Sequence, residues 1–415
     1  MIPLPVSELA KLGRLDATAD SVTGVHIDSR RIRPGDLFVA VRGGVDYLDE
    51  ARAAGAAATL VPDDDLAAMA AIGRALRDRS DAEIVGITGS TGKTSTKDIL
   101  AALVRPHRRT VAAEASFNAE LGVPLTLARL EPDTELLIAE LAMRGFGQIS
   151  ELCEIARPTL GVITAIGPVH LEFVESVAGV AKAKAELLEA LPTGATAVVP
   201  SGAAELEPYL RTDLRVVRLG EDARLLGFDG GRLEAEVLGE RLELELPFRT
   251  PHQAENALVA LAVYAALELP LDRVYEGARE IELSRLRGEE LPLSSGGVLI
   301  NDCWNANPAS MAAALRDLAA RANGGRRLAV LGGMAELGSE STRYHEEIGR
   351  LLQAHEIDHV IAVGELARAY GTGEWVSDAD EAAERLAELV QPGDVVLVKG
   401  SRSVGLERVA EKLHS

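Results

Sequence analysis

Residues 83–96 are EIVGITGSTGKTST, a short β-branched run that leads into a glycine-rich turn and the start of a helical pattern. The glycines let the backbone N–H groups of such a turn point inward, and the N-terminus of the following helix adds partial positive charge. In this arrangement Lys93 reaches the terminal phosphates of a nucleotide, and the Thr94 hydroxyl binds Mg²⁺. The stretch therefore predicts a nucleoside triphosphate site that is made by Gly89, Ser90, Thr91, Gly92, Lys93, Thr94 and Ser95.

The loop departs from the strict phosphate-binding motif at one position. That motif has a glycine five residues before the Gly of Gly-Lys, and this chain has Ile87 there, with Gly86 one residue earlier. The alternative interpretation is a glycine-rich turn without a ligand. The strand before the loop and the helix after it favour the phosphate site.

Length, charge and cysteine content limit the class of protein. At 415 residues the chain is too long for one hydrophobic core, so we expect several domains. A formal net charge of −21 argues against a nucleic-acid partner, because phosphate backbones require clustered Lys and Arg. Cys153 and Cys303 lie in different halves, which excludes a disulfide framework and a cysteine-based zinc site. The sequence shows neither a membrane-spanning apolar run nor the features of a signal peptide at residues 1–13, so we expect a cytoplasmic protein.

The pattern of apolar runs predicts an α/β chain of three domains, at residues 1–81, 82–287 and 288–415. The first combines short strand-like runs with alanine-rich helical stretches, which indicates a small α/β domain. In the second, strands and helices alternate as in a mostly parallel sheet, with one strand predicted over residues 160–166. Residues 223–248 indicate an attached antiparallel meander, and residues 272–279 a helix after it. The third repeats strand–helix pairs in the manner of a Rossmann-like domain. Residues 283–296, rich in Arg, Gly and Ser, are predicted to form a linker.

Two further motifs carry a resemblance to a known family. They are Asp302-Cys303-Trp304-Asn305-Ala306-Asn307-Pro308, and Gly333-Met334-Ala335-Glu336-Leu337-Gly338 with His345 downstream. Together with the phosphate loop they resemble the Mur ligase superfamily, the ATP-dependent amide-bond ligases of bacterial cell-wall synthesis. The similarity spans essentially the whole chain and is greatest to the type that adds D-alanyl-D-alanine to UDP-N-acetylmuramoyl-tripeptide. It implies that the three domains bind the UDP-substrate, ATP and the acceptor, in that order.

Three residues are candidates for Mg²⁺ binding and catalysis beside Lys93. Glu140 ends a predicted strand, where a carboxylate can complete a Mg²⁺ shell with Thr94, although a solvated strand-end carboxylate is the alternative. By themselves, His170 would more often be structural and Lys184 would be a solvated helix lysine. The resemblance implies instead that Glu140 and His170 bind Mg²⁺. It also implies that Lys184, which fits the spacing from His170 better than Lys182, carries a CO₂-derived carbamate that holds the second Mg²⁺.

The resemblance also assigns residues to the substrates. It implies that Asn256 contacts adenine, that Arg287 grips ATP, and that Asp302 meets the nucleotide from the third domain. The alternatives are a helix-capping role for Asn256 and a mobile linker arginine for Arg287. It assigns Ser29, Arg30 and Asn118 to the UDP-substrate, and Asn305, Asn307, Lys399, Ser401 and Arg402 to the region of the acceptor. The uracil contacts stay open, because the family's Asp-Gly-His is Asp46-Tyr47-Leu48 here.

The implied reaction follows from the chemistry of carboxylates. A carboxylate is a poor acyl donor, so ATP with two Mg²⁺ would first convert the terminal carboxylate of UDP-N-acetylmuramoyl-tripeptide into an acyl phosphate. The amine of D-alanyl-D-alanine would then displace phosphate, and domain closure would exclude water. We expect a monomer that contributes to peptidoglycan synthesis. The alternatives are another amide ligase of the same scaffold, of the MurE type or a folylpolyglutamate synthase, and more remotely a P-loop kinase.

Overall fold

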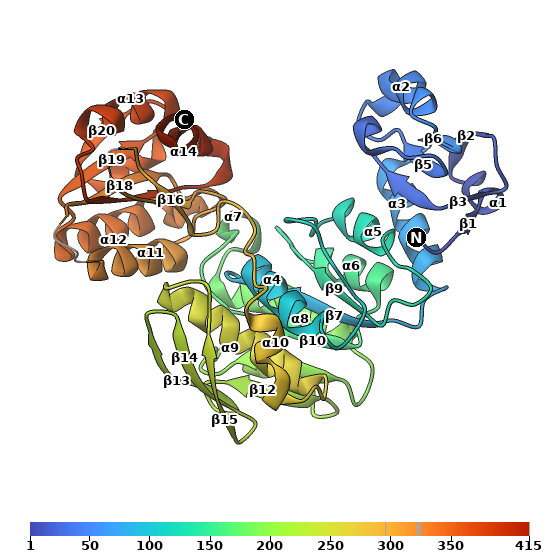
Figure 1. Ribbon diagram of the computed structural model, residues 1–415, viewed down its shortest axis with the longest axis horizontal. Coiled ribbons are helices and arrows are strands. Elements are labelled where there is room, and N and C mark those ends of the chain that lie inside the picture. Colours follow the sequence, from blue (N-terminus) through green and yellow to red (C-terminus); the bar gives the residue numbers. More distant parts are fainter. Residues whose placement is uncertain (295, 322–324, 415) are drawn as a thin grey trace.

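The structure is a computed structural model that describes residues 1–294, 296–321 and 325–414. Its elements form three groups along the chain (Figure 1). The first group, in blue, and the last, in red, stand at opposite ends, and the central group from cyan to yellow lies between them. The mixed α/β class with mostly parallel sheets is as predicted, while the exact domain boundaries stay a prediction.

The central group is built on a nine-stranded sheet. Its order is β15 (Glu240–Glu245), β14 (Arg232–Val237), β13 (Ala223–Asp229), β12 (Arg215–Leu219), β11 (Thr196–Pro200), β10 (Leu160–Ile163), β7 (Glu83–Thr88), β9 (Leu136–Glu140) and β8 (Thr110–Ala112). Strands β12 to β8 pair in parallel, and β13, β14 and β15 form the predicted antiparallel meander. The chain enters at β7, goes first to β8 and β9 and then to β10 on the other side. The carboxyl end of β7 is therefore a topological switch point, where open α/β sheets bind ligands.

Helices cover this sheet as the apolar spacing predicts. Helix α4 (Lys93–Val104) buries most of its length against α9 (Pro251–Ala266), and α8 (Val177–Ala190) packs against α6 (Gln148–Ala156). Two predicted bounds are wrong. The strand predicted to reach Ile166 ends at Ile163, because Thr164 turns to hydrogen-bond the phosphate loop. The helix predicted over residues 272–279 is a 3₁₀ turn at Leu271–Arg273 followed by the short α10 (Tyr275–Ala278).

The first group contains a four-stranded sheet in the order β2 (Gly13–Ala17), β6 (Ala58–Pro62), β5 (Asp36–Val39) and β4 (Gly24–His26). A small ribbon of β1 (Leu4–Pro5) and β3 (Ser21–Val22) and the helices α1 (Val6–Leu9) and α2 (Leu48–Ala53) accompany it. Helix α3 (Asp65–Arg77) packs against α5 (Gly122–Leu127) and α6 of the central group. The approach is close at Gly73, where a Cβ would lie 2.9 Å from the Ile155 side chain. The first sheet is thus fastened to the central one through α3.

The last group has a six-stranded sheet in the order β16 (Glu289–Pro292), β17 (Gly297–Asp302), β21 (Asp394–Lys399), β18 (Arg327–Gly332), β19 (His359–Val363) and β20 (Glu374–Val376). All neighbours except β16 and β17 run parallel, as in the predicted Rossmann-like arrangement. The helices are α11 (Pro308–Ala320), α12 (Ser341–Ala354), α13 (Ala379–Leu389) and α14 (Glu407–His414). Residues 322–324 and 415 of this predicted domain lie outside the described part of the chain.

The prediction of a linker over residues 283–296 is wrong at its centre. Residues 289–292 form the edge strand β16, which pairs antiparallel with β17. The run is too short to show an alternating pattern, and only its edge position accommodates Pro292, because proline cannot donate to a strand on both sides. Residue 295 lies outside the described residues.

Two observations on the described part of the chain concern membrane-spanning helices and disulfides. No helix there is long and apolar enough to cross a membrane. Cys153 and Cys303 are both buried and free, so no disulfide links them.

Candidate active site

The phosphate loop joins β7 to α4, and neighbouring segments fix its shape. Gly89 (φ 149°) and Gly92 (φ 80°) adopt torsions that residues with side chains rarely adopt. A Cβ at Gly89 would collide with the Thr164 hydroxyl, and one at Gly92 would collide with the Asn256 side chain. Thr164 also donates a hydrogen bond of 2.5 Å to the Thr91 carbonyl. The loop is therefore held in its curved form by protein contacts alone.

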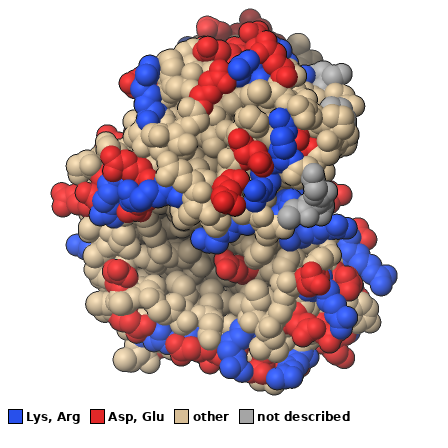
Figure 2. Space-filling view, turned by 90° about the vertical axis from the view of Figure 1, so that its left-hand side faces the viewer, with Lys and Arg blue, Asp and Glu red and all other residues tan. Residues whose placement is uncertain are grey.

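A cavity of about 760 Å³ opens beside this loop. Its size suits a small-molecule site, for which volumes of roughly 300–1,000 Å³ are typical. Figure 2 shows one face of the molecule, hollowed between its upper and lower parts, with charges of both signs around the hollow. The cavity brings together most of the predicted site residues: Ser90, Thr91, Gly92, Lys93, Thr94, Ser95, Asn118, Glu140, His170, Asn256, Arg287, Asp302, Asn305, Asn307 and Lys399.

Glu140 is the centre of a hydrogen-bonded group at the end of β9. The carboxylate is 1% exposed, and it accepts hydrogen bonds from the Thr94 hydroxyl (2.9 Å) and from the Asn118 amide (2.7 Å). Arg287 donates to the Thr94 hydroxyl at 3.2 Å. Arg287 is thus packed against the loop rather than mobile, and Asn118, predicted to meet the UDP-substrate, lies against the predicted metal ligand.

His170 links the central group to the third. Its Nδ1 lies 2.5 Å from the Glu336 carboxylate, which also pairs with Arg144 at 3.1 Å. Burial lowers the pKa of His170, although Glu336 opposes that shift. Nδ1 donates its proton to Glu336, since a carboxylate only accepts. Glu336 is a residue of a quoted motif to which the sequence assigned no role.

Two buried lysines, Lys93 and Lys184, lie close enough for their charges to interact. Lys93 donates to the Gly89 carbonyl at 2.7 Å, and burial lowers its pKa while Glu140 opposes the shift. Lys184 is 1% exposed, and burial lowers its pKa well below the usual value, with the charge of Lys93 adding to the effect. Among the described residues, Lys93 is the only charged group that shifts it. Lys182, by contrast, is exposed with its Nζ 5.3 Å above the Phe146 ring. The alternative of a solvated helix lysine is therefore wrong for Lys184.

The predicted adenine contact depends on a residue that the sequence comparison passed over. The Asn256 amide donates to Gln253 Oε1 at 2.9 Å, and Gln253 in turn donates to the Arg287 carbonyl at 3.2 Å. The sequence prediction assigns a role to Asn256 and none to Gln253. Its position three residues before Asn256, on the same helix face, was the available signal.

The third group contributes a compact set of polar residues to the cavity. Lys399 is 2% exposed, and its Nζ donates to Asp302 Oδ2 (2.6 Å) and to the Asn305 carbonyl (3.1 Å). Asn307 caps α11 by accepting from the Ser310 amide (2.9 Å), and its side chain donates to the Ser90 carbonyl (3.4 Å). The third group therefore touches the phosphate loop directly.

Two predicted acceptor residues do not line the cavity. The Ser401 hydroxyl accepts from the Ala335 amide at 2.9 Å. Arg402 pairs with Glu407 at 2.9 Å, and its guanidinium lies 5.2 Å from the Trp304 ring. Their part in acceptor binding stays a prediction.

Of the three residues predicted to bind the UDP-substrate, Asn118 lines the cavity, whereas Ser29 and Arg30 lie outside it. Ser29 is buried, whereas the Arg30 side chain is 81% exposed and pairs with Asp28 at 2.7 Å. That pairing lowers the pKa of Asp28 to about 2. The first group reaches the cavity through Arg42, which the sequence did not single out.

The donors around Glu140 suit a hard cation. A carboxylate and a hydroxyl at 2.9 Å supply the oxygen ligands that Mg²⁺ prefers. The described residues contain no group of three or more His, Cys, Asp or Glu side chains placed to hold a metal. The predicted set differs from such a group, because it includes a hydroxyl and a modified lysine.

Comparison with known proteins accounts for this arrangement. Residues 87–264 match the Mur ligase middle domain, and residues 287–402 match the Mur ligase glutamate ligase domain. The chain belongs to the Mur ligase family.

One relative and two solved structures show the type of Mur ligase to which this chain is similar. This Mur ligase is 34% identical to the UDP-N-acetylmuramoyl-tripeptide–D-alanyl-D-alanine ligase of Synechocystis sp., over 94% of this chain and 92% of that protein. The structure of MurF from Acinetobacter baumannii is similar over 99% of both chains, with 25% identity and a TM-score of 0.88. The MurF ligase of Thermotoga maritima in complex with ADP is similar over 95% of this chain and 97% of that one, with 28% identity and a TM-score of 0.82.

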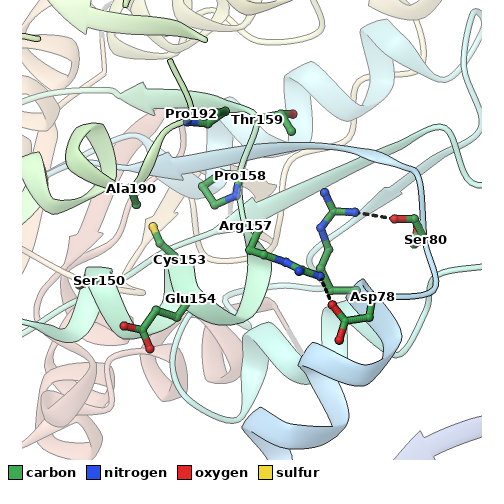
Figure 3. Close-up of a pocket in the computed structure, with 11 residues that line it drawn as sticks. Asp78, Ser80, Ser150, Cys153, Glu154, Arg157, Pro158, Thr159, Ala190 and Pro192 are labelled. Atoms are coloured by element: carbon green, nitrogen blue, oxygen red, sulfur yellow. Dashed lines mark hydrogen bonds and ion pairs between the residues drawn. The ribbon is translucent and has the colours of Figure 1, made fainter. Parts of the chain in front are cut away.

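A second cavity of this Mur ligase, of about 870 Å³, is lined by residues that precede β7 and β10, at the amino ends of these strands (Figure 3). Its polar groups are occupied with one another: Arg77 donates to the Ser80 carbonyl (2.7 Å), and Arg157 pairs with Asp78 (2.5 Å). Burial raises the pKa of the Cys153 thiol to about 12, so the thiol is unreactive. Although larger, this cavity lacks the chemistry of the first.

Proposed function

We propose that this Mur ligase joins D-alanyl-D-alanine to UDP-N-acetylmuramoyl-tripeptide at the expense of ATP. The observation that carries the proposal is the cavity in which the phosphate loop and the buried Glu140 face residues of the third group. Lys184 does not line this cavity and lies buried beside Lys93. The Synechocystis relative named for this reaction is similar over nearly its whole length. The Thermotoga maritima structure with ADP supports ATP as the phosphoryl donor.

The chain's own groups suit the phosphoryl-transfer step. The loop N–H groups and Lys93 surround the place for the phosphates, and Arg287 stands 3.2 Å from the Thr94 hydroxyl at the same point. These cations would stabilise the charge that spreads over the transferred phosphoryl group as the substrate carboxylate attacks it. The products of this step are an acyl phosphate and ADP.

Mg²⁺ would be held by Thr94 and Glu140, and a second ion by His170 and Lys184 as its carbamate. When bound, Mg²⁺ neutralises phosphate oxygens and orients them. The low pKa of Lys184 supports the carbamate, because only an uncharged amine can attack CO₂. In that step the amine nitrogen forms a bond to the carbon of CO₂, and the electron pair of one C=O π bond moves to oxygen, which gives the carboxylate. The nitrogen then releases a proton.

The amide-forming step would take place where the third sheet meets the loop. The dipeptide amine attacks the acyl phosphate carbon, phosphate leaves, and the amine gives up a proton. Asn305 and Asn307 offer polar groups at this side of the cavity, and the contact of Asn307 with Ser90 supports a seated third domain that excludes water. Ser29 and Arg30 would hold the UDP-substrate from the first domain. The enzyme would act in the cytoplasm, as a monomer, in peptidoglycan synthesis.

The test is a product assay with the purified full-length chain. With ATP, Mg²⁺, UDP-N-acetylmuramoyl-tripeptide and D-alanyl-D-alanine, mass spectrometry should detect a product heavier by the dipeptide less one water. Glutamate and free diamino acids as acceptors separate the alternative amide ligases. ATP turnover with no amide product under any of these conditions would favour a kinase and contradict the proposal.

A further inference from the structure

The loop of residues 333–338 follows β18 and is held in a rigid frame. The Met334 amide donates to His345 Nε2 at 2.9 Å, and His345 Nδ1 lies 2.7 Å from the Ser341 carbonyl. The Ala335 amide donates to the Ser401 hydroxyl at 2.9 Å. The loop thus stands on α12 and on the segment after β21, and its next residue projects from a fixed base.

That next residue, Glu336, has a left-handed backbone with φ 62°, and so has its partner His170 with φ 55°. Residues other than glycine rarely adopt this conformation, and its cost is borne where surrounding contacts require it. The Glu172 amide donates to the Glu336 carbonyl at 3.2 Å, which joins the two backbones as well. Both sides of the contact are therefore held in place.

The Glu336 carboxylate has two partners on the central group. One oxygen lies 2.5 Å from His170 Nδ1 and the other lies 3.1 Å from Arg144 Nε. His170 lines the nucleotide cavity, and no hydrogen bond to its Nε2 is found within residues 1–294, 296–321 and 325–414. A carboxylate on one ring nitrogen fixes the tautomer and the ring plane. The other nitrogen then carries no proton, and its lone pair can bind a metal ion.

We propose that Glu336 is a positioning residue: it holds the His170 ring with Nε2 toward the nucleotide cavity and, together with Arg144, fastens the third domain to the central one. A residue of the third domain thereby sets the orientation of a metal ligand in the central domain. The metal part of this inference rests on the proposed function, whereas the fastening of the two domains does not.

The first test measures the fastening in the nucleotide-free protein. Glu336→Gln keeps the size of the side chain and removes its charge. Glu340→Gln, two residues beyond the loop, is the matched control, because within the described residues Glu340 pairs with Arg343 of α12 and with no group of the central domain. Small-angle X-ray scattering should show a closed-to-open ratio reduced by about tenfold for Glu336→Gln, because both contacts are charge-assisted, and unchanged for Glu340→Gln. Arg144→Gln should act in the same direction, and the exchanged pair Arg144→Glu with Glu336→Arg should restore closure.

The second test measures the orientation of His170. Mn²⁺ with ADP serves as the probe, and pulsed electron paramagnetic resonance detects the nitrogen of a coordinated histidine. The wild-type protein and Glu340→Gln should show this nitrogen coupling, and Glu336→Gln should lose it or bind Mn²⁺ about tenfold more weakly. The exchanged pair should not recover it, since it restores the ion pair between the domains but not the carboxylate on His170.

The outcomes separate this inference from the proposed function. Unchanged scattering and an unchanged nitrogen coupling in Glu336→Gln overturn it. A loss of coupling without a change in scattering overturns the fastening alone. If the wild-type protein forms no amide product, the proposed function fails, while the scattering comparison still decides whether Glu336 fastens the domains.

Discussion

The carboxyl ends of the central sheet and of the third sheet both bury lysine, but they satisfy it differently. Lys399 of the third sheet meets the Asp302 carboxylate and the Asn305 carbonyl. Lys184 of the central group is equally buried, and among the described residues the like charge of Lys93 is the one that shifts its pKa. Ionising a buried amine without a partner of opposite charge is costly, and groups perturbed in this way cluster at functional sites. We therefore expect the central group to carry the reactive residues and the third group to support them.

The largest effect is expected for Lys93→Ala. This change removes the cation at the phosphate loop and should lower the rate of amide formation by about 10³-fold. It also removes one hydrogen bond, to the Gly89 carbonyl, and the fold should persist without it. The measurement is product formation alongside thermal unfolding, with Lys182→Ala as the control. Wild-type turnover by a folded Lys93→Ala protein would show that the reactive groups lie elsewhere.

Lys184→Ala should lower kcat by about 10²-fold, because it removes both the amine and its carbamate. Acetate or formate should fill part of the vacated space and restore some activity. The same anions should have no effect on Lys182→Ala, whose exposed side chain is the matched control. Full activity of Lys184→Ala would show that Lys184 takes no part in the reaction.

Arg30→Ala tests whether the first group has a substrate of its own. Loss of a charge-assisted contact to a diphosphate should raise the KM for the UDP-substrate by about tenfold and leave the KM for ATP constant. Arg33→Ala, an exposed neighbour, should change neither. An equal rise of both constants would contradict the assignment of Ser29 and Arg30.

The smallest effect is expected for His345 of the third group, which supports the loop of residues 333–338. Burial lowers the pKa of His345 in the folded chain below the unfolded value of about 6.5. Its contribution to stability is therefore complete above pH 6.5 and is lost as the pH falls, since the unfolded chain then binds the proton more readily. Between pH 7.5 and 5.5 the free energy of unfolding should therefore fall more in the wild type than in His345→Gln. The free energy of unfolding is measured by urea titration at each pH. An equal change with pH in the wild type and in His345→Gln would contradict this role.

The sequence predicts the parts of the site that depend on local pattern. The phosphate loop, Glu140 at the end of its strand and the α/β alternation all follow from residue order over short spans. Other features depend on contacts between distant segments. The burial of Lys184, the support of Asn256 by Gln253 and the contact between Glu336 and His170 arise only when separate elements pack. The strand β16 escaped prediction for the same reason, because its pairing with β17 stabilises a run too short to show a period.

One peptide group belongs to two parts of the molecule at once. The Arg287 carbonyl accepts from Gln253 on α9, and the Gly288 N–H of the same peptide plane donates to the Asn301 carbonyl on β17 at 3.1 Å. Gly288 has φ 76°, a torsion open to glycine. A rotation of the third sheet must therefore break one of these two bonds or turn the chain about this plane. The Arg287 side chain donates to the Thr94 hydroxyl. The peptide group that joins the two sheets and the guanidinium that contacts the phosphate loop therefore belong to one residue.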